Sequence, residues 1–149
     1  MPTMKRFLGV LAVIYILVSG CTVHSSEVTS PDGHIRLVFA LDGNNRMTYQ
    51  VSVGDTAFVT PSLLGFLAKD GVNLAEGFKV INTDFTTYDE TWTQPWGENK
   101  NIRNHYNEMA VHLSDTTNTK LTLRFRIFDD GLGFRYEYEV PGADSILVT

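Results

Sequence analysis

From Pro31 onward, apolar and polar residues alternate with a period of two, which is the pattern of β-strands that bury one face. The clearest strands are 34–41 and 47–53, and the intervening segment Asp42-Gly43-Asn44-Asn45 has the composition of a turn. We therefore predict that these two strands form a hairpin. A short strand over 56–59 should end before Pro61, because proline cannot donate a ladder hydrogen bond.

Strand patterns continue beyond Pro61, and no segment has a convincing helical period. We expect strands over 63–68, 78–87 and 109–114, and at most one helical turn over 72–78. Strands of this length with short polar connections are typical of sandwiches and barrels. The pattern therefore predicts an all-β fold built of antiparallel strands.

The strongest alternation lies near the carboxyl end, where two strands should form a second hairpin. One strand places Leu121, Leu123, Phe125 and Ile127 on one face, and the other does so with Phe134, Tyr136, Tyr138 and Val140. Residues opposite each other share a face of the sheet. The odd-numbered apolar residues of the first strand must therefore lie opposite the even-numbered apolar residues of the second, so the two residue numbers of each opposed pair add up to an odd number.

The charged residues favour one register for this hairpin. If the residue numbers of each opposed pair add up to 261, Arg126 lies opposite Arg135. If they add up to 263, Arg126 lies opposite Glu137 and Arg124 lies opposite Glu139. Opposed like charges destabilise a strand pair by some tenths of a kcal/mol to about 1 kcal/mol. We therefore predict the sum of 263, which stacks Phe125 on Tyr138 and Ile127 on Tyr136 and leaves 130–133 as the loop. Asp129 and Asp130 should serve the turn.

The size of the chain limits it to one domain. Its 149 residues are 43% hydrophobic and 19% charged, which is the composition of a globular protein. Residues 144–149 read as a strand that is just beginning, without a turn after it. We expect that the fold is incomplete at its carboxyl end, that the chain is a fragment of a longer protein, and that the fragment alone is poorly behaved in solution.

The amino-terminal residues indicate export. Lys5-Arg6 precede the apolar run 7–18, and Ser19-Gly20-Cys21 follow, as in a secretory signal. The position of the only cysteine resembles the lipobox of bacterial lipoproteins, in which this thiol is acylated. We predict a signal over 1–21, acylation of Cys21, a tether over 22–29 and a lipid anchor in the periplasm or outer membrane. An ordinary signal with an incidental cysteine, or a buried structural thiol, are the alternatives.

The charge balance excludes nucleic acid as a partner. Removal of Lys5 and Arg6 with the signal takes the 12 basic residues to 10, against 17 acidic residues. Binding to nucleic acid depends on lysine and arginine side chains that neutralise phosphates. A chain this acidic should attach to a membrane only through lipid at Cys21.

The chemically richest segment is 89–108, which combines aromatic, charged and amide side chains around Pro95-Trp96-Gly97. Aromatic rings present an apolar face beside a polar edge, which suits the C–H face and the hydroxyl groups of a sugar. Because a loop this long is usually functional, we predict that the segment faces sugar or a second domain. The candidate residues are Trp92, Trp96, Glu98, Arg103, Asn104 and Tyr106. The structural alternative makes Trp96 a core residue and pairs Arg103 with Glu98 or Glu108.

The same segment resembles the amino-terminal domain of glycoside hydrolase family 97. The resemblance rests on Glu90-Thr91-Trp92, Pro95-Trp96-Gly97-Glu98, the run 102–108 and the run 124–137, with Ser30-Pro31-Asp32-Gly33 and 61–65 as further similarities. It implies a β-sandwich of the super-sandwich type over 30–149, docked on a (β/α)8 barrel in exo-acting α-glucosidases or α-galactosidases that use calcium.

The resemblance also implies where the chemistry lies. A (β/α)8 barrel needs about 200 residues or more, so this chain cannot contain one. The catalytic residues and most calcium ligands of the family belong to the barrel, so we assign no catalytic and no metal residue here. The expected partners are the barrel and an α-linked oligosaccharide, with calcium in the parent enzyme and an inactive isolated chain. The alternative is a free-standing surface lipoprotein that binds saccharide or a protein without catalysis.

Several other sites are disfavoured by spacing. The segment that begins Asp42-Gly43-Asn44 lacks the glycine and glutamate that a calcium-binding EF-hand requires. His105 and His112 have no neighbouring cysteine, so a zinc site is disfavoured. Glu98 and Glu108 could pair as the acid and base of a glycosidase only if they lay about 5 to 9.5 Å apart.

Overall fold

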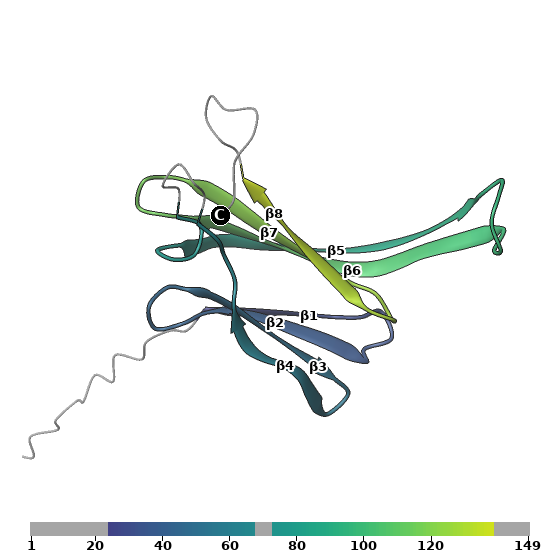
Figure 1. Ribbon diagram of the computed structural model, residues 1–149, viewed down its shortest axis with the longest axis horizontal. Helices are drawn as coiled ribbons and strands as arrows, with labels where there is room; N and C mark the ends of the chain where they lie inside the picture. The colour runs from purple at the N-terminus through teal and green to yellow at the C-terminus, as the bar shows by residue number, and fades with distance from the viewer. Residues whose placement is uncertain (1–23, 68–72, 139–149) are drawn as a thin grey trace, which may run out of the picture.

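The computed structural model describes residues 24–67 and 73–138. The predicted signal, Cys21 and the predicted carboxyl-terminal strand lie outside these ranges. The described residues form two antiparallel sheets of four strands each, stacked face to face (Figure 1). The predicted all-β sandwich is therefore confirmed. No helix in the described ranges is long and apolar enough to cross a membrane.

Sheet one consists of the first four strands in sequence order. They are β1 (Ser25–Thr29), β2 (Ile35–Leu41), β3 (Met47–Val53) and β4 (Thr56–Leu63). The predicted hairpin is confirmed, because β2 pairs with β3 from Ile35 opposite Val53 to Leu41 opposite Met47. Its turn is stabilised by Asp42, whose Oδ1 accepts hydrogen bonds from the backbone N–H groups of Asn44 and Arg46.

Three predictions for sheet one are wrong. Ser25–Thr29 is not a tether but strand β1, which pairs with β2 and buries Val28 opposite Leu37. Pro61 does not end β4, because β4 is an edge strand whose outer N–H groups need no partner. Thr60 and Pro61 together oppose Gln50 in a β-bulge. The strand predicted over 63–68 is also wrong, because β4 ends at Leu63 and no strand covers residues 64–67.

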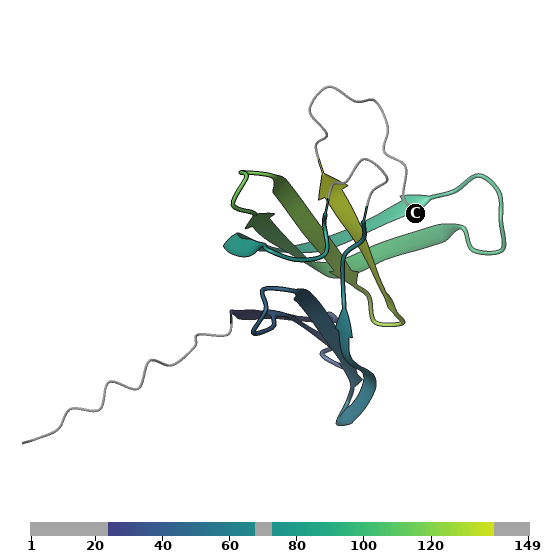
Figure 2. The same ribbon diagram turned by 60° about the vertical axis from the view of Figure 1, so that its left-hand side comes forward.

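Sheet two contains the longest strands. It consists of β5 (Lys79–Thr93), β6 (Asn101–Ser114), β7 (Lys120–Ile127) and β8 (Leu132–Tyr138), again in sequence order. The predicted strands 78–87 and 109–114 are only the inner halves of β5 and β6. Their outer halves pair from Tyr88 opposite Tyr106 to Thr93 opposite Asn101, so the segment predicted as a long loop is largely a hairpin. Figure 2 shows it extending away from the rest of the sandwich.

The predicted register of β7 and β8 is wrong, although its faces are right. Arg124 lies opposite Arg135 and Phe125 opposite Phe134, which is a sum of 259 rather than 263. Phe128 N–H donates to the Gly131 carbonyl (2.8 Å), so Asp129 and Asp130 occupy the turn, as predicted. Glu137 compensates the opposed arginines, because its Oε1 accepts hydrogen bonds from Nε of Arg124 and Nε of Arg135, each at 2.8 Å.

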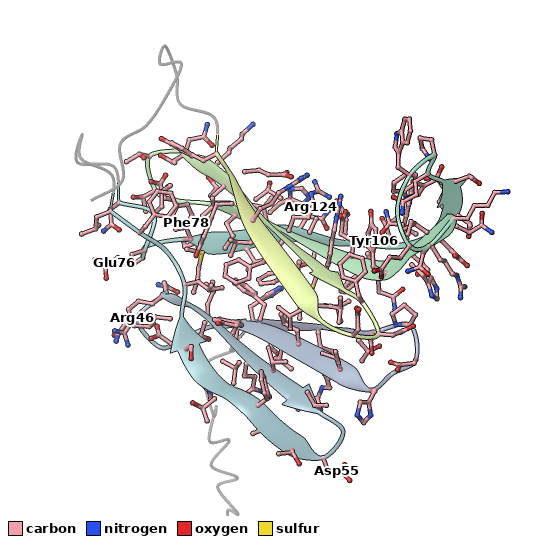
Figure 3. All side chains as sticks on the ribbon, turned by 45° about the vertical axis from the view of Figure 1, so that its right-hand side comes forward. Arg46, Asp55, Glu76, Phe78, Tyr106 and Arg124 are labelled. Carbon is pink, nitrogen blue, oxygen red and sulfur yellow. The ribbon has the colours of Figure 1, made fainter. Side chains whose placement is uncertain are left out.

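The core lies between the two sheets. Phe39 of β2 and Phe125 of β7 are fully buried, with ring centroids 6.2 Å apart. The connection between the sheets closes one end of this core with Leu64, Leu74 and Phe78, all buried. Figure 3 shows Phe78 at this end and Tyr106 at the other, where β5 and β6 leave the sandwich.

Candidate functional site

The outer part of the β5–β6 hairpin, residues 88–106, is called the arm below. A continuous antiparallel ladder gives the arm its shape, and Gln94 N–H closes its tip by donating to the Lys100 carbonyl (3.0 Å). Gly97 turns the chain there with φ of 122°, a conformation that residues with a Cβ rarely adopt. A Cβ on Gly97 would lie 2.5 Å from Nε2 of Gln94. The sequence of the tip is therefore fitted to a tight turn.

The arm has two different faces. Tyr88, Glu90 and Trp92 of β5 share one face with their partners Tyr106, Asn104 and Ile102 of β6. This face continues into the outer surface of sheet two, which carries Arg124 and Arg126. The opposite face carries Asp89 and Arg103 and continues into the core-facing side of sheet two. Three of the six candidate residues, Trp92, Asn104 and Tyr106, therefore share one face.

The other candidates lie elsewhere on the arm. Trp96 and Glu98 occupy the tip, where the Trp96 side chain is 85% exposed. Trp92 is 48% exposed on β5. The alternative that Trp96 fills the core is wrong. The arm therefore presents both tryptophans of the chain to its surroundings.

Arg103 has a different partner from those considered from the sequence. Its Nε and Nη2 donate to the two carboxylate oxygens of Asp89 at 2.8 and 2.7 Å. These hydrogen bonds lower the pKa of Asp89 below its ordinary value. This bidentate pair links β5 and β6 across the face of the arm that continues into the core-facing side of sheet two. The structural alternative, in which Arg103 pairs with Glu98 or Glu108, is wrong.

Tyr106 anchors the arm on sheet two and is buried. Its ring stacks on Tyr88 with centroids 5.2 Å apart and contacts Phe128 at 5.1 Å. The guanidinium carbon of Arg126 lies 4.7 Å from the centre of the Tyr106 ring, which is a cation–π geometry. Tyr106 is therefore a structural residue at the base of the arm rather than a freely accessible contact residue.

Beside Tyr106, a network of ion pairs covers the outer surface of sheet two. Glu108 accepts hydrogen bonds from Nη1 of Arg124 (2.5 Å) and Nε of Arg126 (2.7 Å), and its side chain is only 11% exposed. Burial raises the pKa of Glu108, but the hydrogen bonds from Arg126 and Arg124 outweigh burial and lower it overall. Glu137 joins the network, and hydrogen bonding from Arg124 lowers its pKa to about 2.

This lowered pKa predicts a pH dependence of stability. Glu137 has an ordinary pKa of 4.5, so its charge stabilises the fold fully above pH 4.5, and that contribution is lost as the pH falls toward about 2. We expect Glu137→Gln to lower the free energy of unfolding at pH 7 and to have progressively less effect between these pH values. Urea unfolding of both proteins at several pH values measures this. An equal difference at pH 7 and pH 2 would contradict it.

The geometry excludes the simplest catalytic pair. The stretch of β6 from Asn101 to Glu108 is about 24 Å long, at roughly 3.4 Å per residue, and Glu98 lies beyond its far end. The acid and base of a glycosidase lie about 5 to 9.5 Å apart. Glu98 and Glu108 therefore cannot act on one glycosidic bond. Across residues 24–67 and 73–138, no three His, Cys, Asp or Glu side chains form a group that could hold a metal ion.

Sequence reasoning missed the contacts at the base of the arm. Tyr88, Arg126 and Phe128 were not candidates, although they position Tyr106. The available signal was weak: if β5 and β6 are taken as an antiparallel hairpin with its turn at Gly97, Tyr88 must lie close to Tyr106. The contact of Tyr106 with Arg126 depends on how β7 pairs with β6, and the sequence did not reveal that register.

Comparison with known families matches most of the chain. The model of the family described as "Glycosyl-hydrolase 97 N-terminal" covers residues 28–149. Among characterised proteins, a retaining alpha-galactosidase from Bacteroides thetaiotaomicron is 24% identical over 133 residues, which are 89% of this chain and 19% of that protein.

Solved structures show the same relation. A Glycoside Hydrolase Family 97 enzyme from Pseudoalteromonas sp., solved in complex with panose and with acarbose, is 30% identical and superimposes with a TM-score of 0.75. The match covers 83% of this chain and 19% of that enzyme. A beta-arabinopyranosidase has the same fold, at 24% identity and a TM-score of 0.73. The chain thus spans about a fifth of the length of these relatives.

Proposed function

Because the chain belongs to the glycosyl-hydrolase 97 N-terminal family, we propose that it is the accessory β-sandwich domain of an exo-acting α-glycoside hydrolase. In this proposal, the domain packs on a catalytic (β/α)8 barrel and shapes its active site, and the chemistry lies in the barrel. The observation that carries the proposal is the arm, which extends beyond the rest of the sandwich (Figure 1). Two of its aromatic side chains, Trp92 and Trp96, are exposed.

The construction of the arm supports contact with another domain. A projecting two-stranded hairpin is only marginally stable by itself. This arm is nevertheless held by its continuous strand ladder and by the packing of Tyr106 at its base. Those contacts present Trp92 and Trp96 outward, where large aromatic side chains contribute most by burial against a partner. A stiff arm with tryptophans at its end is suited to filling a hollow beside an active site.

The relatives suggest the substrate class. One is an alpha-galactosidase, and another was solved with panose and acarbose, so we propose an α-linked oligosaccharide as the substrate of the parent enzyme. We propose calcium for the parent enzyme only. No role that we propose for this chain requires a metal. A free-standing binding lipoprotein is not favoured by membership of this family.

The proposed contact can be tested by hydroxyl-radical footprinting. In a chimaera, residues 28–149 of this chain replace the matching part of the Pseudoalteromonas enzyme. We expect oxidation of Trp96 to be several-fold slower in the chimaera than in the isolated chain, because the barrel covers the tip. Phe58 on β4 is 77% exposed and is the internal control, with similar oxidation expected in both proteins. Equal oxidation of Trp96 in both would contradict the contact.

For export, we propose the lipid anchor indicated by Ser19-Gly20-Cys21. We expect labelled fatty acid to be incorporated when the chain is expressed in a bacterial host, and the label to be absent from Cys21→Ser. The thiol of Cys21 is the proposed acceptor, so removal of this one sulfur atom should abolish labelling. Equal labelling of both proteins would show that the cysteine is incidental.

A further inference from the structure

A surface that combines polar and apolar side chains lies at the end of β5 and β6 that is opposite the arm. There a hollow of about 480 Å³ is formed by residues of β5, β6, β7 and the β6–β7 turn. Its lining includes Ile81, Asn82, Asp84, His112, Lys120 and Thr122. Pockets that bind small molecules usually have volumes of about 300–1,000 Å³ and combine apolar walls with a few convergent polar groups. None of these residues contributes to the arm.

A β-bulge shapes one wall of the hollow. Val80 pairs with Leu113 and Asn82 pairs with His112, so Ile81 is an extra residue in β5. The Ile81 side chain is 68% exposed, although it is large and apolar. Bulges redirect side chains and occur often beside binding sites. The bulge therefore supplies an apolar wall that the fold itself does not use.

The polar wall is a chain of hydrogen bonds across three strands. His112 on β6 contacts Asp84 on β5 through Nε2 (2.9 Å) and Thr122 on β7 through Nδ1 (3.0 Å). The Asp84 carboxylate accepts from an Nε2–H of His112, and the Thr122 hydroxyl can either donate to or accept from Nδ1, according to the tautomer of the ring. Asn82 donates to Oδ1 of Asp84 (2.7 Å). This arrangement leaves lone pairs of Asp84 and Thr122, and the Asn82 carbonyl, available as acceptors.

We propose that this hollow binds one neutral hexopyranose unit of a saccharide. The acceptors of Asp84, Thr122 and Asn82 suit ligand hydroxyl groups, which donate, and the ammonium group of Lys120 donates to ring or hydroxyl oxygens. Ile81 faces the C–H surface of the ring. Asp84 and Lys120 carry opposite charges, so this pair adds no net charge to the lining, which suits a ligand without a net charge. This site does not depend on contact between the arm and a barrel.

The test is a nuclear magnetic resonance titration of the isotope-labelled full chain with methyl α-D-glucopyranoside. We expect saturable shifts of backbone amide signals at 81–84, 112 and 118–122, and weaker binding of glucuronate, which has a similar ring with a carboxylate. His112→Ala should weaken binding about 3- to 10-fold, because Asp84 and Thr122 lose the side chain that positions them, and the cost to the ligand is about that of one net hydrogen bond. Ile81→Ser is a second variant of the hollow. It replaces His112→Ala in the titration if that variant does not fold, because Ile81 is a surface residue.

Phe58→Ala is the matched control, because it removes an exposed apolar side chain of β4 and leaves the hollow intact. It should bind the glucoside like the wild type. Absence of saturable shifts, shifts confined to residues 92–98, equal binding of glucuronate, or wild-type affinity in both hollow variants would overturn the proposal. None of these outcomes bears on whether the arm contacts a barrel, since footprinting of Trp96 measures that contact separately.

Discussion

Phe125→Ala is expected to lower the free energy of unfolding by about 3–5 kcal/mol, the usual cost of truncating a fully buried phenylalanine. Phe125 is 0% exposed and contacts Phe39 of the opposite sheet and Phe134 of β8, with centroids 6.2 and 5.7 Å apart. Its truncation leaves a cavity at the centre of the sandwich. Because domains of this kind are stable by only about 5–15 kcal/mol, the loss is a large part of the total.

Urea unfolding followed by circular dichroism measures this loss. Tryptophan fluorescence is a poor reporter, because both tryptophans lie on the arm rather than in the core. Phe58→Ala is the matched control: its side chain is 77% exposed, and we expect a change within about 0.5 kcal/mol. A similar change in both variants would show that Phe125 is not at the centre of the core.

Glu108→Gln should cost about 1.5–3 kcal/mol, because hydrogen bonds between charged groups contribute that amount when they are shielded from water. The substitution removes the charge that Arg124 and Arg126 share and leaves two guanidinium groups without their common partner. Arg126 also loses the contact that holds it over Tyr106. We therefore expect increased hydrogen exchange in the arm as well as lower stability.

The control for Glu108→Gln is Glu27→Gln. Glu27 pairs with Arg36 at 3.1 Å, but both side chains are more than half exposed, at 59% and 51%. Exposed pairs contribute about 0–1 kcal/mol. Equal effects of the two substitutions on unfolding would contradict the special role of the Glu108 network.

The fold could be predicted where strands alternate between one buried and one exposed face. This holds for β2, β3 and β7, which were placed closely. The arm could not be recognised as strands, because both of its faces are largely exposed and its residues do not alternate. The register of β7 and β8 failed because pairwise charge rules do not include a carboxylate shared by two arginines. β1 was missed because Val28 is its only buried residue.

The sequence identified the segment that holds the candidate residues but did not predict how their side chains are arranged. The mixture of aromatic and charged residues directed the prediction to 89–108, and the structure places Trp92 and Trp96 of this segment on the exposed surface. The roles of Arg103 and Tyr106 depend on which strand each residue faces. Sequence spacing alone could not show that Arg103 binds Asp89 or that Tyr106 packs under Arg126.

The most direct measurement compares hydrolysis of aryl α-glucosides and α-galactosides by the full chain and by the Pseudoalteromonas chimaera, with folding monitored in parallel. If the chain is an accessory domain, the full chain should show no turnover with or without calcium, and the chimaera should be active. Trp96→Ala and Arg103→Ala in the chimaera should lower its activity by more than lost stability explains. Turnover by the full chain that disappears in Glu98→Gln would contradict the accessory role.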